Sequence, residues 1–575
     1  MKRIIAIALA AAMLCACNSY KVTSPQGDIS VKVTENLMTV SYKGAVVQTV
    51  GIQAGKPSKA TKAVRIDEEY DMVVGKSHHC SNSAFARTLT FADCEMEVRA
   101  YNDGVTYRFI GKHPEVSYQI ADGTKRWLLK EKQDYEGLYP LSDKAEAGVW
   151  YYPALFELGD GVFGLYTESG VYRGQCGSHL VNAGEDAYNV VAADEEFPEG
   201  TSAWRVMIVG GLSDLVASTL VTDVAEPSVL DDTSWIEPGV SAWIYWSANH
   251  GSSDYAQVKD FIDLAAEMHW PYHLIDGGWP MMRNGGTMED AVAYAREKGI
   301  KTNVWYNSAQ LFGWSEMLDP ETREAELSRI EAIGVTGVKI DFFKDDTSNS
   351  MEYYMDLVEA AAKHHLLVDF HGCTLPRGWE RTYPNLMTYE AVMGAEWYNN
   401  GPQMTDAAAA HNATLPFTRN IVGPMDYTAG TFSDSQHPHI TTWAHELALP
   451  VIFESGLVHM PDRPSAYYAL SAEVKDFLGN LPSTWDETRL IAGYPGEYVV
   501  LARRNGDAWY IGAINGSDEP RHIDADLGCL GVDAAGCELY TDGEDGKSIL
   551  SDDFDGLALS IDCLPRGGFV AVVRQ

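Results

Sequence analysis

The fold is decided by the stretch Gly334-Val335-Thr336-Gly337-Val338-Lys339-Ile340-Asp341-Phe342-Phe343-Lys344-Asp345-Asp346. Its centre, residues 335–343, is a short apolar run that follows a glycine and ends in polar residues, which is typical of a buried strand. Two charges interrupt the run: Lys339 and Asp341 are two residues apart and therefore point to the same face. A carboxylate at the C-terminal end of a parallel barrel strand is where such folds place their chemistry. The alternative is a buried ion pair that only fixes packing.

Strand-like runs alternate with amphipathic helical runs on both sides of this stretch, from Ser241 onward. The predicted helices cover residues 255–268, 288–298, 321–333 and 351–364. The predicted strands cover residues 242–246, 272–279, 300–306, 335–343, 366–370 and 386–390, with 421–423 and 450–453 as the last two. Right-handed repetition of such units predicts a (β/α)8 TIM barrel. The alternative is an open doubly wound sheet, but no GxGxxG or GxxxxGK[ST] motif follows a strand, so a nucleotide-binding version lacks support.

Both flanks of the barrel alternate with the period of β-strands. Glu95 to Tyr101 alternates before the barrel, and Ala508 to Ile514 follows a hairpin turn at Asn505-Gly506 after it. We therefore predict a leader over residues 1–17, an N-terminal β-sandwich over 20–236, the barrel over 237–474, and a C-terminal β-sandwich over 475–575.

The first residues form a targeting segment. Lys2 and Arg3 precede an apolar run over residues 4–14 that is too short to span a membrane. Leu14-Cys15-Ala16-Cys17 resembles a bacterial lipoprotein box, in which the last cysteine is lipidated after cleavage. The residue after it is Asn18 rather than Asp, which favours the outer membrane of a Gram-negative bacterium. The alternative is an ordinary secretory signal.

Composition and cysteine usage exclude several classes. Apolar residues make up 46% of the chain and the net charge is −38, so this is a globular protein that a nucleic-acid backbone would repel. The seven cysteines after the leader are scattered, without a CxxC pair or a Cys/His cluster for zinc. Cys80 with Cys94, or Cys529 with Cys537, are candidate disulfides of an exported protein, and free thiols are the alternative.

Polar groups and tryptophans gather where the predicted barrel strands end. The polar groups are Asp276, Asn303, Asp341, His371, Glu390 and Glu396, and the tryptophans are Trp243, Trp246, Trp279, Trp305 and Trp397. Aromatic rings stack on the C–H faces of sugars and carboxylates bond sugar hydroxyls, so one rim with both favours a carbohydrate cleft. Two carboxyls are what glycoside hydrolysis requires. The alternative is that Glu390 and Glu396 only pair with nearby arginines.

Several separated motifs, in the same order, are similar to those of glycoside hydrolase family 97. They are Val338-Lys339-Ile340-Asp341-Phe342-Phe343, Asp369-Phe370-His371-Gly372, Arg381-Thr382-Tyr383-Pro384-Asn385, Gly394-Ala395-Glu396-Trp397 and Gly423-Pro424-Met425-Asp426-Tyr427-Thr428. The resemblance implies a sandwich–barrel–sandwich enzyme that acts on an oligosaccharide or polysaccharide. It also implies Ca²⁺ bound by Glu168, Glu390 and Glu396.

The resemblance distinguishes two branches. An inverting branch, acting on α-glucosides, carries a glutamate after the histidine of the fifth strand, where this chain has Gly372. A retaining branch, acting on α-galactosides, carries an aspartate nucleophile on the fourth strand, which Asp341 matches, and a general acid/base, which Glu396 matches. The run Lys344-Asp345-Asp346-Thr347 departs from the family pattern.

We therefore predict a lipid-anchored, calcium-dependent, retaining exo-glycosidase. Its product is α-D-galactose or the stereochemically similar β-L-arabinopyranose. The alternatives are an inverting α-glucosidase and a non-catalytic carbohydrate-binding lipoprotein. The residues expected to contact the sugar are Lys339, Asn303, His371, Asp276, Trp279 and Trp397.

Overall fold

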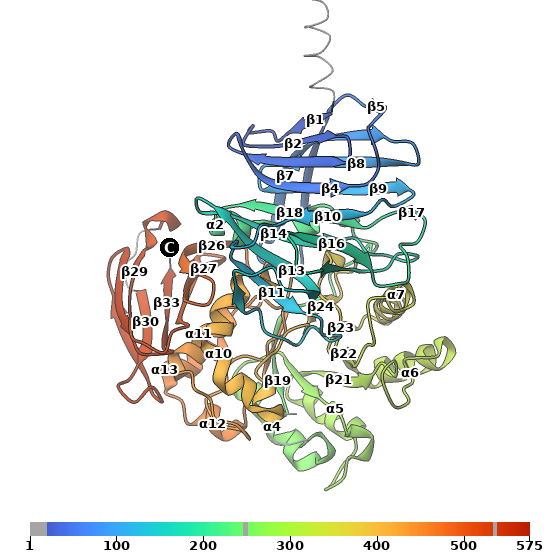
Figure 1. Cartoon of the computed structure of the whole chain (residues 1–575). Coiled ribbons are helices and arrows are strands. Elements are labelled where there is room, and N and C mark those ends of the chain that lie inside the picture. Colours follow the sequence, from blue (N-terminus) through green and yellow to red (C-terminus); the bar gives the residue numbers. More distant parts are fainter. Residues whose placement is uncertain (1–19, 245–250, 533–536, 575) are drawn as a thin grey trace, which may run out of the picture.

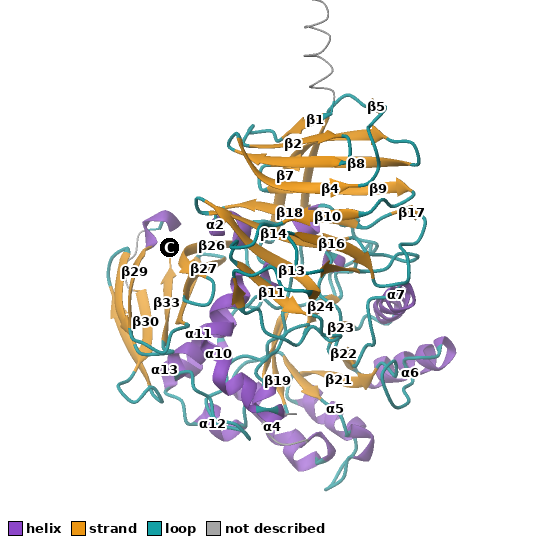
Figure 2. Ribbon diagram, in the orientation of Figure 1, coloured by secondary structure: helices purple, strands orange, loops and turns teal. Residues whose placement is uncertain are grey.

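The computed structural model describes residues 20–244, 251–532 and 537–574. A large antiparallel β region, a parallel barrel and a smaller β region follow one another along the chain (Figures 1 and 2). Cys17 with the predicted leader, and Trp246, lie outside the described residues. No helix in the described part is long and apolar enough to cross a lipid bilayer. The seven cysteines of the described part are free thiols.

The N-terminal region is an antiparallel sheet of eighteen strands within residues 20–244, stacked in layers above the barrel in Figure 1. Its strands are β1 (Lys21–Thr23), β2 (Ile29–Thr34), β3 (Leu37–Tyr42), β4 (Ala45–Ile52), β5 (Lys59–Ala60), β6 (Val64–Asp71), β7 (His79–Thr90), β8 (Cys94–Tyr101), β9 (Gly104–Gly111), β10 (Val116–Gln119), β11 (Arg126–Lys130), β12 (Leu141–Ser142), β13 (Gly148–Gly159), β14 (Val162–Ser169), β15 (Ser178–Asn182), β16 (Ala187–Ala192), β17 (Gly200–Thr201) and β18 (Trp204–Gly210). In β2, Ile29, Val31 and Val33 are buried while the residues between them face outward, so the sequence alternation fixes which face packs inward. The short helices α2 (Leu212–Ala217) and α3 (Leu220–Asp223) lead toward the barrel.

The barrel strands that the structure describes are all parallel, in the order β24-β23-β22-β21-β20-β19-β25. They are β19 (Gly239–Trp243), β20 (Tyr272–Ile275), β21 (Lys301–Asn307), β22 (Val335–Asp341), β23 (Leu367–Phe370), β24 (Leu386–Tyr389) and β25 (Leu457–Met460). The stretch with Lys339 and Asp341 forms β22, which lies between β23 and β21. The predicted multidomain class, with a central barrel between two β domains, is confirmed.

Four helices follow the first barrel strands at the places that periodicity predicts: α4 (Tyr255–Glu267), α5 (Met288–Glu297), α6 (Pro320–Ile333) and α7 (Ser348–Lys363). The Asp319 side chain caps α6 by accepting from Thr322 N, and Pro320 occupies the first turn. Gly334 ends α6 in a left-handed conformation, with φ 101°, so that the chain turns directly into β22.

The last two barrel strands were predicted wrongly. Residue 421 ends a 3₁₀ turn, η4 (Arg419–Ile421), residues 422–423 form a bend, and residues 450–452 end helix α11 (Trp443–Ile452). All but the first residue of α11 are buried, so the helix has no polar face and its apolar run resembles a buried strand. The remaining helices are α8 (Trp379–Thr382), α9 (Trp397–Asn400), α10 (Pro402–Thr414), α12 (Pro464–Tyr468) and α13 (Ala472–Gly479).

The C-terminal region is a sandwich of two sheets over one core. The larger sheet contains β26 (Glu487–Tyr494), β27 (Tyr498–Asn505), β28 (Ala508–Asn515), β33 (Gly568–Arg574), β30 (Cys537–Asp542) and β31 (Ile549–Phe554), and the smaller one β29 (Arg521–Asp526) and β32 (Ala558–Cys563). Helix α11 of the barrel packs against β28 and β33.

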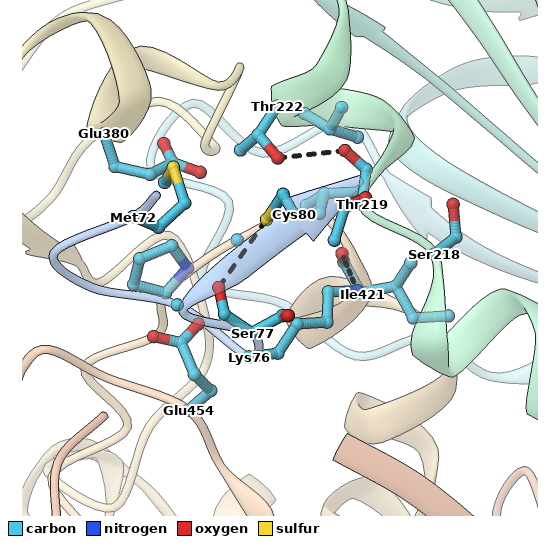
Figure 3. A pocket seen from close by; sticks show the side chains of 15 residues that line it. Met72, Lys76, Ser77, Cys80, Ser218, Thr219, Thr222, Glu380, Ile421 and Glu454 are labelled. Atoms are coloured by element: carbon cyan, nitrogen blue, oxygen red, sulfur yellow. Dashed lines mark hydrogen bonds between the residues drawn. The ribbon is translucent and has the colours of Figure 1, made fainter. Parts of the chain in front are cut away.

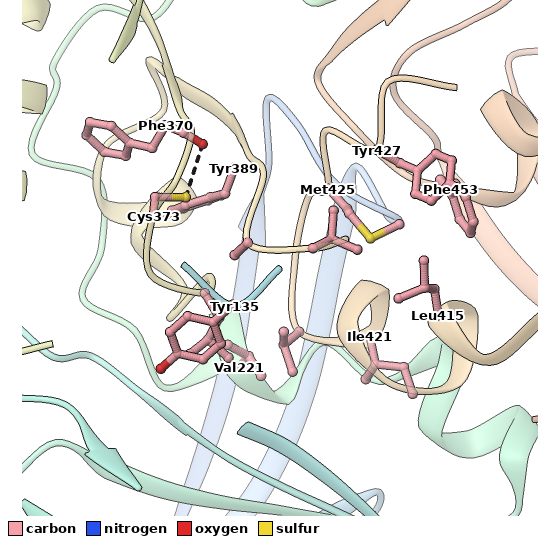
Figure 4. Packing of buried hydrophobic residues seen from close by; sticks show 14 of the residues in the cluster. Tyr135, Val221, Phe370, Cys373, Tyr389, Leu415, Ile421, Met425, Tyr427 and Phe453 are labelled. Atoms are coloured by element: carbon pink, nitrogen blue, oxygen red, sulfur yellow. Dashed lines mark hydrogen bonds between the residues drawn. The ribbon is translucent and has the colours of Figure 1, made fainter. Parts of the chain in front are cut away.

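The N-terminal region and the barrel share one hydrophobic core. Figure 4 shows part of it: Tyr135 and Val221 of the N-terminal region are in the same cluster of buried residues as Phe370 and Tyr389 of the barrel. A core that continues across the boundary holds the two regions in a fixed relation. Side chains of the N-terminal region are therefore placed firmly against the rim of the barrel.

The N-terminal region and the barrel together line a small cavity of about 30 Å³ (Figure 3). Lys76 comes from the turn between β6 and β7, Glu380 from α8, and Glu454 from the segment after α11. The Lys76 ammonium donates to the carbonyl oxygens of Val216 and Ile421, at 3.1 and 2.9 Å. In the described part of the chain, Glu454 Oε1 has no hydrogen-bond partner.

Candidate active site

The C-terminal ends of the barrel strands open into a cavity of about 810 Å³. The carboxylic acids that line it, in the part of the chain described, are Asp134, Glu136, Asp276, Asp341, Glu390 and Glu396. Lys339 and Asp341, two residues apart on β22, both line the cavity. The period of the strand thus presents the two charges to one space. So many acids in one cavity are what a cation or a sugar requires rather than an ordinary core.

One end of the cavity holds a buried ion pair. Lys339 Nζ donates to Asp276 Oδ2 at 3.1 Å, and both side chains are almost completely buried. The indole of Trp243 lies under this pair: its Nε1 donates to Asp276 Oδ2 at 2.7 Å, and Lys339 Nζ is 4.2 Å from the ring centroid. Burial would lower the pKa of Lys339, but Asp276 and the neighbouring acids outweigh it and raise the pKa. The ammonium is therefore a fixed hydrogen-bond donor facing the cavity.

Asp341 is held between an indole and a glycine. Trp305 Nε1 donates to Asp341 Oδ2 at 3.1 Å. Gly372 lies against the other oxygen: a β-carbon placed on Gly372 would be 2.9 Å from Asp341 Oδ1 and 3.0 Å from Phe342 N. Burial raises the pKa of the Asp341 carboxyl to about 6, against the lowering effect of His371 and Lys339. At neutral pH the group is mostly a carboxylate.

Glu390 and Glu396 form an unequal pair of acids. Glu390 Oε2 accepts from Gly372 N at 2.7 Å and lies 3.2 Å from His371 Nδ1. Burial would raise the pKa of Glu390, but the charge and hydrogen bond of His371 outweigh it and lower the pKa to about 2. Burial, followed by the charge of Glu390, raises the pKa of Glu396 well above its usual value. Glu390 is therefore a permanent anion, and Glu396 retains a proton.

His371 connects this pair to a second polar cluster inside the barrel, which the sequence analysis did not foresee. Asp426 Oδ2 lies 2.7 Å from both His371 Nε2 and His459 Nδ1. Both oxygens of Asp369 are buried without a hydrogen-bond partner in the described part of the chain, and burial raises the pKa of this carboxyl to about 7. The motif Gly423-Pro424-Met425-Asp426 was recognised, but only contacts in the fold show that Asp426 fixes the ring of His371.

The N-terminal region contributes two further acids. Asp134 and Glu136 line the cavity from the loop between β11 and β12, which carries Tyr135 between them in a left-handed conformation with φ 60°. Trp397 Nε1 donates to Glu136 Oε2 at 2.6 Å. Burial, and then the charge of Glu390, raises the pKa of Glu136 well above its usual value. The Glu136 carboxyl therefore interacts electrostatically with the acids of the barrel.

Glu168 does not line this cavity and belongs to no group of possible metal ligands in the described part of the chain, which corrects the ligand set that the family resemblance implied. It is completely buried, and its carboxylate lies 2.5 Å from Arg205 NH1 and 2.9 Å from Arg377 Nε. Ser178 Oγ also donates to it, at 2.6 Å. Two guanidinium groups already neutralise its oxygens, so the group does not fit a cation. Arg377 continues to Asp346 at 2.9 Å, and Asp346 also accepts from the hydroxyl of Tyr135.

Of the other predicted sugar contacts, some line the cavity and some do not. Asn303 is buried in β21 and accepts from Thr336 Oγ1 at 3.2 Å, which makes it part of the wall between strands rather than of the cavity. Trp279 is half-buried and donates from Nε1 to the carbonyl of Trp305 at 2.8 Å, so it supports the lining residue Trp305 from behind. Trp397 supports Glu136 in the same way. Asp276 and Lys339 line the cavity directly.

Comparisons with known families agree with this geometry along the whole chain. The family described as Glycoside hydrolase 97 matches residues 235–392, its N-terminal domain matches residues 22–227, and its C-terminal domain, described as oligomerisation, matches residues 484–574. The chain belongs to glycoside hydrolase family 97. It is accordingly a glycosidase, and glycans are its substrates.

Relatives within family 97 extend over most of the chain. A probable retaining alpha-galactosidase of Streptomyces bingchenggensis is 34% identical over 550 residues, covering 88% of this chain and 82% of its own. A retaining alpha-galactosidase of Bacteroides thetaiotaomicron is 29% identical, covering 89% and 88%. A solved beta-arabinopyranosidase structure superposes with a TM-score of 0.88 at 26% identity, covering 96% of this chain and 99% of its own.

This family 97 glycosidase thus builds its cavity from two domains. The barrel acids were predictable because each ends a strand or lies in a recognised motif. Asp134 and Glu136 precede the barrel altogether, on a loop without a strand or helix period to mark it. The signal that could have identified them is the pair of acids on either side of an aromatic residue, Tyr135.

Proposed function

We propose that this enzyme is a retaining exo-glycosidase that releases terminal α-D-galactose or β-L-arabinopyranose by double displacement. Two relatives are named as retaining alpha-galactosidases, one of them as probable, and a structural neighbour is named as a beta-arabinopyranosidase. The two sugars differ only in the hydroxymethyl group on the ring, so one polar cavity can suit both.

The contact between Gly372 and Asp341 carries the retaining part of the proposal. An inverting enzyme needs a base that activates a water, with the two carboxyls about 6.5–9.5 Å apart. The residue after His371 would supply that base in the inverting branch, and here it has no side chain. The Asp341 carboxylate fills this space, since a β-carbon at residue 372 would be only 2.9 Å from Oδ1. Asp341 is therefore left to attack the sugar directly.

The two steps follow from the protonation states of Asp341 and Glu396. In the first step, an Asp341 oxygen forms a bond to the anomeric carbon while the bond to the leaving-group oxygen breaks and Glu396 protonates that oxygen. In the second step, Glu396 takes a proton from water, the water oxygen attacks the anomeric carbon, and Asp341 leaves as a carboxylate. The mostly ionised Asp341 and the protonated Glu396 match these roles.

Asp276 and Lys339 are the proposed contacts of the terminal sugar, whereas His371 does not line the cavity and has both ring nitrogens beside Glu390 and Asp426. The fixed Lys339–Asp276 pair offers both a donor and an acceptor to ring hydroxyls, and it lies almost completely buried at the cavity wall. Each buried polar group that binds a hydroxyl rejects a sugar lacking it, because the group would then be left unpaired. This supports cleavage at a chain end rather than within a chain.

Calcium is the proposed cofactor. Glu390 and Glu396 belong to a group whose ligand atoms, together with a nitrogen of His371, lie within 4.8 Å of one another. We take Glu136 rather than Glu168 as the third carboxylate, because Glu136 lines the same cavity as Glu390 and Glu396, whereas Glu168 does not line it and is bound by two arginines. Three carboxylates that repel one another fit a hard divalent cation with oxygen ligands. Such a cation would offset their repulsion and hold the N-terminal loop against the barrel.

The anomeric configuration of the first product tests the mechanism. Aryl α-galactoside and aryl β-L-arabinopyranoside are each mixed with the enzyme, and proton NMR is recorded before mutarotation. We expect the sugar to appear first in the configuration of the substrate. An inverted first product would refute both the retaining mechanism and the role of Asp341. Absence of turnover across a broad panel of aryl glycosides would refute the substrate class.

We also propose that the enzyme is exported and anchored by a lipid on Cys17, in the outer membrane of a Gram-negative bacterium. The sequence Leu14-Cys15-Ala16-Cys17-Asn18 after a basic start and an apolar run supports this. Metabolic labelling with a radioactive fatty acid should mark the wild-type chain but not Cys17→Ala. Equal labelling of both would contradict the anchor, and membrane fractionation tests the outer location.

A further inference from the structure

An apolar surface borders the cavity on the side that faces solvent. Met281, Leu311 and Phe312 line the cavity, and the exposed fractions of Met281 and Phe312 are 72% and 56%. Met281 follows β20 and the other two follow β21, so they come from neighbouring loops of the rim. Large apolar side chains that are exposed together around a polar cavity mark a binding surface.

Aromatic rings connect this surface to the nucleophile. Trp305 donates to Asp341 Oδ2, its ring centroid is 6.0 Å from that of Phe342, and Phe342 is 4.6 Å from Phe312. Phe342 adopts φ +72°, a left-handed conformation that residues with side chains rarely adopt. A strained residue next to the reacting carboxylate is found where function requires its placement.

The loop after β21 holds Phe312 in a defined position. Asn307 Nδ2 donates to the carbonyl of Phe312 at 2.7 Å, and Asn307 Oδ1 accepts from Ala309 N at 2.8 Å. Gln310 Oε1 accepts from Lys344 N at 3.0 Å, which ties this loop to the one after β22. The ring of Phe312 is therefore presented to the cavity by an ordered backbone, although it is more than half exposed.

Polar amides line another part of the same rim. Asn400 and Gln436 are exposed, line the cavity, and come from segments after β24. A pyranose ring has one face of C–H groups and an edge of hydroxyls, so an apolar surface together with amides suits a second sugar.

We infer that Met281, Leu311, Phe312 and Phe342 form the leaving-group subsite, and that it accepts a second pyranose ring, with its C–H face on Phe312 and its hydroxyls toward Asn400 and Gln436. This inference rests on the proposed function, because it places the terminal sugar at Asp276, Lys339 and Asp341. The leaving group must then extend toward solvent along the rim. An aryl leaving group can contact only the apolar side chains of this subsite and not its amides.

Three substrates with the same terminal sugar and different leaving groups test the subsite. Fluoride is too small to reach Phe312, an aryl group reaches the apolar surface only, and a second sugar reaches both surfaces. Phe312→Ala should lower kcat/KM roughly tenfold for the disaccharide and the aryl glycoside. The same variant should leave the glycosyl fluoride within about twofold of wild type, because the chemistry at Asp341 is intact.

Two further variants complete the test. The double variant Asn400→Ala/Gln436→Ala should lower kcat/KM for the disaccharide severalfold and leave the aryl glycoside unchanged. Leu318→Ala is the matched control: Leu318 is 49% exposed and lies in the chain segment that follows Phe312, but it does not line the cavity. It should change none of the three rates.

The outcomes separate this inference from the proposed function. If Phe312→Ala lowers kcat/KM equally for all three substrates, the inference is overturned, because Phe312 would then support the nucleophile rather than bind the leaving group. No loss on any substrate would overturn it as well. If the double variant lowers kcat/KM for the aryl glycoside as much as for the disaccharide, the assignment of a second sugar to this subsite is overturned. Failure of the wild-type enzyme to hydrolyse any glycosyl fluoride would instead refute the proposed function.

Discussion

At the scale of single residues, the absence of a side chain at Gly372 is as important as the carboxylate of Asp341. Gly372 has φ +45°, and a β-carbon there would contact Asp341 Oδ1 at 2.9 Å. Gly372→Ala should therefore displace the carboxylate and lower kcat by about 10²-fold or more, since small misplacements of catalytic groups are costly. Gly299→Ala is the matched control, because Gly299 also has a positive φ, +78°, but open space around it. Similar activity of the two variants would show that Asp341 is not sensitive to residue 372.

The nucleophile itself can be tested by chemical rescue. Asp341→Gly should lower kcat by about 10³-fold or more, and azide should restore part of the turnover of a substrate with an activated leaving group. The small anion enters the space left by the carboxylate and attacks from the same side, so the glycosyl azide should have the inverted configuration. Asp341→Asn fills that space and should not respond to azide. Normal activity of Asp341→Gly would exclude the nucleophile role.

At the scale of elements, the sequence predicts what is local and periodic. Helices α4, α5 and α7 were placed within a few residues because their apolar faces recur with the helical period. Helix α6 has only a weak apolar face, but its ends carry the caps Asp319 and Gly334. The prediction of a strand over residues 450–453 was wrong because α11 is buried on almost all sides, so its apolar residues do not recur with the helical period. Asp341, Glu390 and Glu396 were foreseen by their motifs, whereas Glu136 reaches the cavity only through the docking of a distant loop.

That loop, between β11 and β12, carries a prediction about the metal. Glu136→Gln keeps the size of the side chain and removes one of the three carboxylates around the proposed calcium site. We expect the variant to need at least tenfold more calcium for half-maximal activity after chelation, because fewer charged ligands weaken calcium binding. Calcium should also raise its Tm less than that of wild type, since stabilisation follows the ratio of ligand concentration to Kd.

Glu131→Gln is the control for this loop, because Glu131 is exposed and does not line the cavity. This variant should need the same calcium concentration for half-maximal activity as wild type does. The same calcium dependence for Glu136→Gln would remove Glu136 from the ligand set. A wild-type enzyme that stays fully active after thorough chelation, with no calcium by elemental analysis, would remove the cofactor altogether.

At the scale of the whole molecule, the three regions act as one body because buried contacts cross each boundary. Glu168, Arg377 and Asp346 link the N-terminal sheet to the loops after β23 and β22. Arg503 of the C-terminal sandwich donates to the carbonyl of Ile452 at 2.7 Å, next to the cavity that contains Glu454. Asp346 also accepts from the hydroxyl of Tyr135 in the Glu136 loop, so the position of this loop depends on how the N-terminal region and the barrel are assembled. A sequence read region by region does not show this dependence.

The junction in Figure 3 makes this assembly sensitive to pH. Burial raises the pKa of Glu454 to about 7, against the lowering effect of Arg503 and Lys76. An unfolded glutamate titrates near pH ~4.3, so between there and pH 7 the folded chain holds a proton that the unfolded chain has released. The stability contributed by this proton is complete below the unfolded pKa and is lost as the pH rises through 7, with a slope of up to ~1.4 kcal/mol per pH unit.

Glu454→Gln cannot titrate, so its free energy of unfolding should fall less than that of wild type between pH 5 and pH 8. Glu195→Gln, at an exposed position, should follow wild type. Denaturant unfolding at both pH values measures the difference, and parallel pH profiles for wild type and Glu454→Gln would show that the junction does not hold the proton.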